Sequence, residues 1–107
     1  MILYNVTVNV DEDVHQVWLE WMKAEHLPMV MQTGKFLTCK MFKILSVQED
    51  ETGHTYSIQY TANSMADYED YSQNFAPALQ AETKQRFDGK FVAFRTLLEL
   101  THQYEDN

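Results

Sequence analysis

The stretch WLEWMKAEHLPMVMQTGKF, from Trp18 to Phe36, decides how this chain folds. Its first part predicts an amphipathic helix, because apolar side chains recur there at helical spacing. The members of this apolar stripe are Val14, Val17, Trp18, Trp21 and Met22. The acidic run Asp11-Glu12-Asp13 comes just before it and supplies an N-cap and favourable negative charge for the helix start.

The end of this helix raises a question about Glu25. In a straight helix Glu25 would lie in the middle of the apolar stripe and His26 at its edge, and a buried carboxylate is costly unless it is paired or protonated. The residue before a proline resists helical dihedral angles, so we expect the helix to bend or fray before Pro28 and release Glu25 to water. Pro28 then suits the first turn of a second short helix, which runs through Gln32.

Outward from this stretch, residues 2–10, 36–47, 54–61 and 90–101 have the composition and alternation of β-strands. Gly34 closes the turn before the second of them. The polar run Gln48–Gly53 predicts a hairpin loop between the second and the third.

A second helical stripe lies between the last two predicted strands. Ser64 and Asp67 form a variant capping box at its start, and Asp88-Gly89 ends it. Pro77 lies inside the pattern, so we expect a kink or a helix restart near Ala76. The stripe consists of Met65, Tyr68, Tyr71, Phe75 and Leu79.

The order strand, helix, strand, strand, helix, strand predicts a ferredoxin-like α+β sandwich (βαββαβ). Right-handed crossovers would give it a four-stranded antiparallel sheet with two helices on one face. With 107 residues, the chain has room for one domain. We place that domain at residues 1–101 and a polar tail at residues 102–107.

Two helices cover only one face of such a sheet. We expect the helices to pack on the richer apolar sets, which are Val6, Val8 and Val10 on the first strand and Val92, Phe94 and Leu98 on the last. The other face would then mix Leu3, Phe91, Ala93 and Leu97 with Asn5, Thr7, Arg95 and Glu99. A mixed face of this size is typical of a partner surface, and the simplest partner is a second copy of the chain. We therefore expect a homodimer that Leu97→Glu would dissociate.

Composition and charge exclude several classes of function. The net charge is -8 and the basic residues are scattered, which argues against binding to nucleic acid or to anionic membranes. No apolar run is long enough to span a bilayer. The lone Cys39 fits a reducing compartment, so we expect a cytoplasmic protein. The chain lacks the spacing of a metal site and the glycine-rich loop of a phosphate site, so we expect no metal and no cofactor.

Several stretches carry a resemblance to known proteins: MILYNVTVNVD, WLEWMKAEHLP, TGKF and TYSIQYT. Over nearly its whole length the chain resembles a family of short bacterial proteins known only as a domain of unknown function. More loosely, it is similar to the dimeric α+β-barrel superfamily, whose members pair two ferredoxin-like sheets face to face. That superfamily includes cofactor-independent monooxygenases, haem-degrading enzymes and small isomerases. Such relatives often place a histidine near the end of the first helix, and His26-Leu27-Pro28 matches this habit.

His26 is the best candidate for chemistry, because a near-neutral pKa suits proton transfer. The alternative is a boundary histidine that only hydrogen-bonds locally. Trp18 and Trp21 either line an aromatic pocket or belong to the core. If a ligand site exists, we expect it between the first helix and the sheet, bounded by His26, Trp18, Trp21 and Tyr4.

Two hypotheses of function remain open at this point. One is a dimeric module that binds a small apolar or aromatic ligand or serves interaction alone. The other is a cofactor-independent enzyme, similar to a monooxygenase or an isomerase, with its pocket near His26. A closed, polar-lined cavity at His26 would favour the enzyme, and a fully packed His26 would favour the module.

Overall fold

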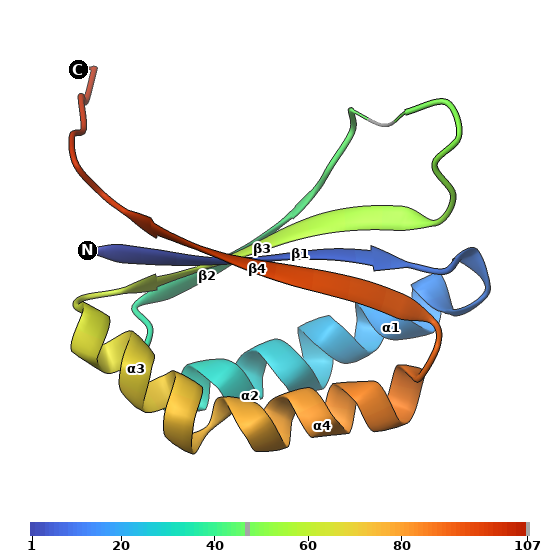
Figure 1. Ribbon diagram of the computed structural model, residues 1–107, viewed down its shortest axis with the longest axis horizontal. Coiled ribbons are helices and arrows are strands. Elements are labelled where there is room, and N and C mark those ends of the chain that lie inside the picture. The colour runs from blue at the N-terminus through green and yellow to red at the C-terminus, as the bar shows by residue number, and fades with distance from the viewer. Residues whose placement is uncertain (47, 107) are drawn as a thin grey trace.

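A four-stranded antiparallel sheet carries every helix on one of its faces (Figure 1). The computed structural model describes residues 1–46 and 48–106. The sheet order is β2-β3-β1-β4, which confirms the ferredoxin-like α+β fold predicted from the order of elements. The strands are β1 (Ile2–Val10), β2 (Thr38–Lys43), β3 (His54–Ala62) and β4 (Phe91–Glu99).

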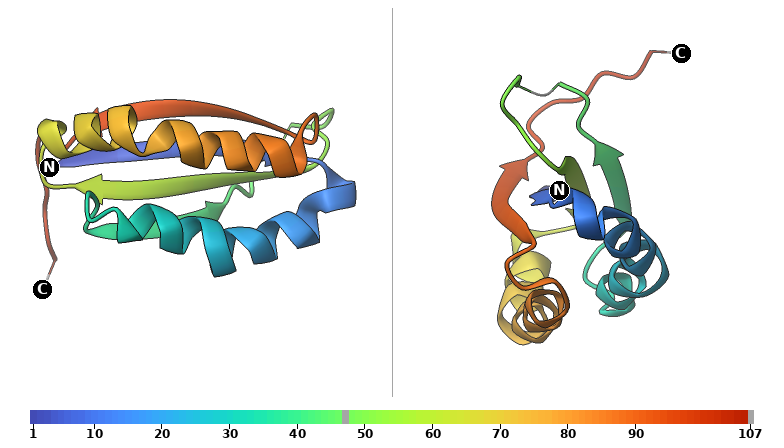
Figure 2. Two further views of the ribbon diagram at one scale, coloured as in Figure 1. Left: turned by 90° about the horizontal axis from the view of Figure 1, so that it is seen from below. Right: turned by 90° about the vertical axis from the view of Figure 1, so that its right-hand side faces the viewer.

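The helices form two rods side by side under the sheet (Figure 2). The first rod joins a 3-10 turn, η1 (Glu12–Val14), to α1 (His15–Trp21), a π-helical segment η2 (Met22–His26) and α2 (Leu27–Gln32). The second rod consists of α3 (Met65–Asn74) and α4 (Ala76–Phe87). The predicted restart at Ala76 is confirmed, with Pro77 in the first turn of α4.

The two predicted N-caps had different outcomes. Ser64 Oγ accepts a hydrogen bond from the Asp67 backbone N–H at 3.2 Å, as expected for a cap of α3. Asp11 is the N-cap residue of η1, and Glu12 and Asp13 lie in its first turn, as expected, but the Asp11 side chain makes no cap hydrogen bond. The neighbouring Asp13 instead forms an ion pair with Lys90 at 2.8 Å, which ties the helix start to the strand β4 region.

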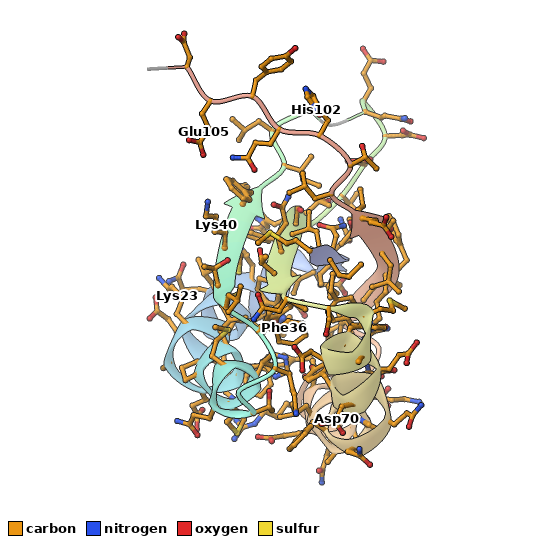
Figure 3. The ribbon with its side chains drawn as sticks, turned by 90° about the vertical axis from the view of Figure 1, so that its left-hand side faces the viewer. Lys23, Phe36, Lys40, Asp70, His102 and Glu105 are labelled. Atoms are coloured by element: carbon orange, nitrogen blue, oxygen red, sulfur yellow. The ribbon has the colours of Figure 1, made fainter. Side chains whose placement is uncertain are left out.

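The core lies between the sheet and the two rods. The strictly alternating β1 and β3 turn one face toward the helices, and paired residues across the sheet share that face because side chains alternate along each strand. Trp18 and Val30 from the first rod are almost fully enclosed there. Figure 3 shows Phe36, which precedes β2, in the space between the sheet and the helices. The buried strand residues are Ile2, Tyr4, Val8, Val10, Tyr56, Ile58, Tyr60 and Ala62.

The prediction for β4 was wrong about which face meets the helices. The register pairs Val8 with Ala93 and Val6 with Arg95, so these β4 residues lie on the helix side. Phe91 and Ala93 pack against the core, and Leu97 pairs with the buried Tyr4.

The apolar set Val92, Phe94 and Leu98 lies on the open face, where Val92 is 69% exposed and Phe94 is 65% exposed. Both faces of this strand are apolar in part, so the pattern did not decide its orientation. The pairing of β4 with β1 decided the orientation of β4. This pairing begins where the Asp11 backbone N–H donates to the Lys90 carbonyl at 2.9 Å.

The open face of the sheet has a polar centre and apolar flanks. A chain of side-chain hydrogen bonds runs across β1 and β3, including Ser57 Oγ to Asn5 Oδ1 at 2.6 Å and Asn9 Nδ2 to Thr55 Oγ1 at 3.0 Å. The apolar flanks are Val92, Phe94 and Leu98 on β4, and Phe42 on β2.

Some element boundaries differ from the prediction. The strand expected over residues 36–47 is limited to Thr38–Lys43, and the last strand ends at Glu99. Residue 47 of the strand expected over 36–47 and residue 107 of the predicted tail lie outside the described residues. The tail that carries His102 and Glu105 extends beyond the sheet on the side away from the helices (Figure 3).

Candidate functional site

The first helical rod does not break at Pro28, contrary to our expectation. Leu27 has helical dihedral angles, and its backbone N–H donates to the Met22 carbonyl five residues earlier. This wider π turn leaves room for the proline ring, which in a regular helix would clash with the carbonyl four residues before it. The helix therefore continues through Pro28 to Gln32.

The π turn also decides which side chain faces the sheet. It adds one residue to the turn, so the positions that face the sheet run from Met22 to His26 to Val30, and Glu25 lies exposed. The expected release of Glu25 to water is confirmed, although the helix neither frays nor ends. His26 takes the place toward the sheet that a regular helix would have given to Glu25.

A cavity of about 60 Å³ lies between the first rod, α4 and the sheet, and His26 contributes to its wall. Seven apolar side chains provide most of the lining, and five polar ones meet around it. The apolar residues are Val6, Val8, Trp18, Met22, Ile58, Phe91 and Ala93, and the polar residues are His26, Tyr60, Gln80, Thr83 and Arg95. The cavity meets neither condition set above, because His26 is not fully packed and the walls are not mainly polar.

His26 is half-buried and lacks a strong hydrogen-bond partner. Its Nδ1 lies 3.5 Å from Thr83 Oγ1, whose hydroxyl donates to the Leu79 carbonyl at 3.1 Å. The Thr83 oxygen is then the acceptor for Nδ1–H, a tautomer that leaves Nε2 free to accept. Burial lowers the pKa of His26 to about 4, so the imidazole is uncharged at neutral pH.

The predicted site residues separate into two groups. Trp18 lines the cavity together with His26. Trp21 does not line it, although its ring lies 5.1 Å from that of His26. Trp21 packs instead against Phe87, with the Arg86 guanidinium 5.3 Å from its ring centre.

Tyr4 also lies outside the cavity lining, in an aromatic cluster between β1 and α3. Its ring centre is 5.0 Å from that of Tyr68, and its hydroxyl accepts a hydrogen bond from Arg95 Nε at 3.0 Å. Burial raises the pKa of Tyr4, and the Arg95 charge opposes that shift. Tyr4 is therefore linked to the cavity wall through its hydrogen bond with Arg95.

Sequence reasoning missed several polar residues of the cavity wall. Arg95 was assigned to the open face because the orientation of β4 was misjudged. Gln80 and Thr83 follow Ala76 and precede Phe87 at helical spacing on α4. Two polar side chains within a stripe that also holds the buried Ala76 and Phe87 were a readable signal of a site.

A pair of histidines meets at the far end of the sheet, separate from the cavity. The rings of His15 and His54 stack with centres 3.7 Å apart, and His15 Nε2 lies 2.6 Å from the Tyr56 hydroxyl. His54 also contacts the Glu12 carboxylate. Burial is the main cause that lowers the pKa of His15, and the neighbouring His54 adds to it. In residues 1–46 and 48–106, no group of three or more His, Cys, Asp or Glu side chains could hold a metal ion.

Two further features of the described part of the chain bear on function. No helix in it is long and apolar enough to cross a membrane. Cys39 lies on the helix side of β2, where burial raises the pKa of its thiol to about 11. A thiol that stays protonated is a poor nucleophile, so Cys39 adds nothing to the chemistry of the site.

Several solved structures have the same architecture as this chain. HapK from Hahella chejuensis aligns with a TM-score of 0.71 over 100% of both chains, at 13% identity. An ethyl tert-butyl ether (EthD) family protein from Bacillus halodurans C-125 aligns with a TM-score of 0.70, at 12% identity, over 94% of this chain and 100% of its own.

SnoaB, a cofactor-independent oxygenase from Streptomyces nogalater, aligns with a TM-score of 0.67, at 8% identity, over 98% of this chain and 97% of its own. At these identities the likeness shows a shared fold alone. No curated protein matches the sequence. Residues 1–101 match a family model, and the chain belongs to the family described as Domain of unknown function (DUF4286).

Proposed function

We propose that this chain is a homodimeric module that binds a small, largely apolar ligand in the cavity beside His26. The observation that carries the proposal is the cavity itself. Mainly apolar walls with a few polar groups that meet at one place are typical of small-molecule sites. Well-packed interiors leave few voids larger than a water molecule. A cavity beside a half-buried histidine therefore supports the binding of a ligand there.

The surroundings of His26 favour binding over acid–base catalysis. A general base works best when its pKa lies near the working pH, and the pKa of His26 is about 4. In the described part of the chain, no carboxylate hydrogen-bonds to His26 to raise that value or to orient the ring. An uncharged imidazole with a free Nε2 is well suited to accept a hydrogen bond from a ligand.

The test is a fragment titration in which the cavity is filled by mutation. Ala93 lines the cavity, so Ala93→Leu should occupy it and abolish binding of small apolar and aromatic fragments. Binding is followed by tryptophan fluorescence, to which Trp18 in the cavity wall contributes, and by the NMR signals of the His26 ring. The matched control is Ala81→Leu on the exposed side of α4, which should bind as the native protein does. A native protein that binds no fragment, or an Ala93→Leu variant that binds equally well, would contradict the proposal.

The homodimer in this proposal uses the open face of the sheet. Its polar centre is already hydrogen-bonded within one chain, so that centre can be covered without leaving its polar groups unpaired. The exposed flanks, Phe94 on β4 and Phe42 on β2, would supply the apolar contact between two copies. The lone Cys39 suits a reducing compartment, and we place the dimer in the cytoplasm on that ground.

The alternative is a cofactor-independent enzyme that uses the same cavity. The observation in its favour is that His26, Tyr60 and Arg95 all line one cavity, where a base, a hydroxyl and a cation could act on one molecule. Its test is oxygen uptake with a panel of hydroquinones in metal-free buffer. Uptake above the buffer rate that His26→Ala abolishes would favour the enzyme over the binding module.

A further inference from the structure

The positive charges of this acidic protein are only partly neutralised. There are 16 Asp and Glu residues for eight Lys and Arg residues. Four basic residues form ion pairs with carboxylates: Lys23, Lys35, Arg86 and Lys90. The other four form none with any described carboxylate, although acidic residues are twice as frequent as basic ones; they are Lys40, Lys43, Lys84 and Arg95.

Arg95 lies at the boundary between the cavity and the solvent. It lines the cavity and also an open groove of about 290 Å³ between α4 and β4. Its Nε donates to Tyr4 at 3.0 Å, which fixes one edge of the guanidinium against a buried residue. The four remaining N–H bonds of the guanidinium have no acceptor among the described residues, so this fixed cation is available to a ligand.

The groove continues the cavity and adds a second cation. Gln80, Phe91, Ala93 and Arg95 line both, so the two spaces share a wall. Lys84 lines the groove as well, and the Asp88 carboxylate stands in the same groove. Two cations face one carboxylate there, in a molecule whose net charge is -8. This groove therefore favours the binding of an anion, whereas the rest of the surface repels anions.

We propose that the ligand of the cavity is a compact apolar or aromatic carboxylic acid, with its apolar part beside His26 and its carboxylate on Arg95. This inference rests on the proposed binding function and names the ligand class for that site. Arginine is the side chain best suited to carboxylates, because its planar fork can donate two parallel hydrogen bonds.

The size of the cavity agrees with a ligand that spans both spaces. An apolar protein cavity of about 150 Å³ holds one benzene molecule. The cavity volume here is about 60 Å³, so it admits a short alkyl chain or the edge of one ring. The remainder of such a ligand must lie in the groove, where Arg95 and Lys84 are.

The test compares acids with their neutral primary amides. The pairs are hexanoate with hexanamide, benzoate with benzamide, and phenylacetate with phenylacetamide. Dissociation constants come from NMR titrations that follow the Trp18 indole and the His26 ring. We expect at least one acid to bind about tenfold or more tightly than its amide, because the ion pair with Arg95 is lost in the amide. Arg95→Gln should abolish this preference.

Lys40→Gln is the matched control, since it removes one unpaired positive charge from β2 and leaves the cavity wall unchanged. It should retain the full preference for acids. Amides that bind as tightly as acids, or a preference that survives Arg95→Gln, would overturn the inference and leave the binding function standing. If neither acids nor amides bind the native protein, the proposed binding function fails and the inference fails with it.

Discussion

His26 shows how one side chain can acquire its properties from its position on a helix. It faces the sheet beside a cavity, with only a weak contact to Thr83 at 3.5 Å. Burial without an anionic partner favours the uncharged ring and lowers its pKa to about 4. The same burial links its protonation to folding, because the unfolded chain exposes the ring to water.

The first prediction follows from that link. The pKa of an exposed histidine is about 6.5, so His26 of the unfolded chain becomes protonated near that pH. In the folded protein His26 becomes protonated only near pH 4. The unfolded state binds more protons in this window, and stability must fall as the pH falls. Between pH 7.5 and pH 4.5 the expected loss from this residue is about 2.5 kcal/mol. Urea unfolding at both values should show a smaller loss for His26→Gln than for the native protein.

His15 provides the comparison for this experiment. Its pKa is also lowered, chiefly by burial, so it contributes in the same direction over the same window. The carboxylates of Asp13 and Asp70, whose pKa values are lowered by Lys90 and Lys35, lose their stabilising effect only below about pH 4. His15→Gln should therefore retain the His26 contribution. Equal losses in the native protein and His26→Gln would contradict the prediction.

Cys39 gives the second prediction at the residue scale. Burial raises the pKa of its thiol from 9.0 to about 11, which lowers the thiolate fraction at pH 8 by about a hundredfold. The folded protein should react with a disulfide reagent at pH 8 roughly a hundredfold more slowly than the same chain in urea. A folded protein whose thiol reacts as fast as the unfolded one would show that Cys39 is neither buried nor perturbed.

At the scale of elements, the π turn is the feature that separates this helix from a regular one. A π turn contains one residue more than an α turn, so removing one exposed residue from it restores an α-helix without rotating the residues that follow. Ala24 is exposed and lies within η2. A regular turn would press the Pro28 ring onto a carbonyl, at a cost of about 3 kcal/mol.

The third prediction uses this relation. Deletion of Ala24 together with Pro28→Ala should give a folded protein that loses less than about 2 kcal/mol, because Met22, His26 and Val30 keep their places. Deletion of the exposed Ala81 in α4, where the turns are regular, is the control. It rotates Thr83 and Phe87 by about 100° and should cost several kcal/mol. Similar urea midpoints for the two deletions would contradict the π-turn account.

At the scale of the whole molecule, the open face of the sheet is a surface that no described helix covers. Figure 1 shows helices on one side only. Val92 and Phe94 are 69% and 65% exposed there, beside a polar centre that is hydrogen-bonded within the chain. A second copy related by a two-fold axis would cover this surface with the same surface of its partner.

The fourth prediction concerns the proposed dimer. The native protein should have twice the 12.6 kDa mass of one chain in light scattering at micromolar concentration. Phe94→Glu places a charge in the proposed interface twice, once per chain, and should weaken association by roughly a hundredfold or more. Val17→Glu is the control, because Val17 is 67% exposed on α1, away from the sheet. A native mass near 12.6 kDa would refute the dimer.

The sequence by itself determined the order and type of the elements, and with them the fold. It also determined the helix side of β1, the cap at Ser64 and the restart at Ala76, because each depends on neighbours close along the chain. Strict alternation in β1 leaves only one way to bury Tyr4 and Val8. These features follow from local rules that the residues obey one segment at a time.

Only the tertiary structure decided the features that make the site. The faces of β4 depend on its register with β1, which places Arg95 at the cavity and Phe94 on the open face. The π turn depends on the burial of both Trp18 and Val30, which lie on one helical rod on either side of Pro28. It turns His26 toward the sheet in place of Glu25. The cavity is the space that packing leaves between the first rod, α4 and the sheet, so no single segment of the sequence predicts it. Pairing, packing and residual space act between distant parts of the chain, so residue patterns within one segment do not record them.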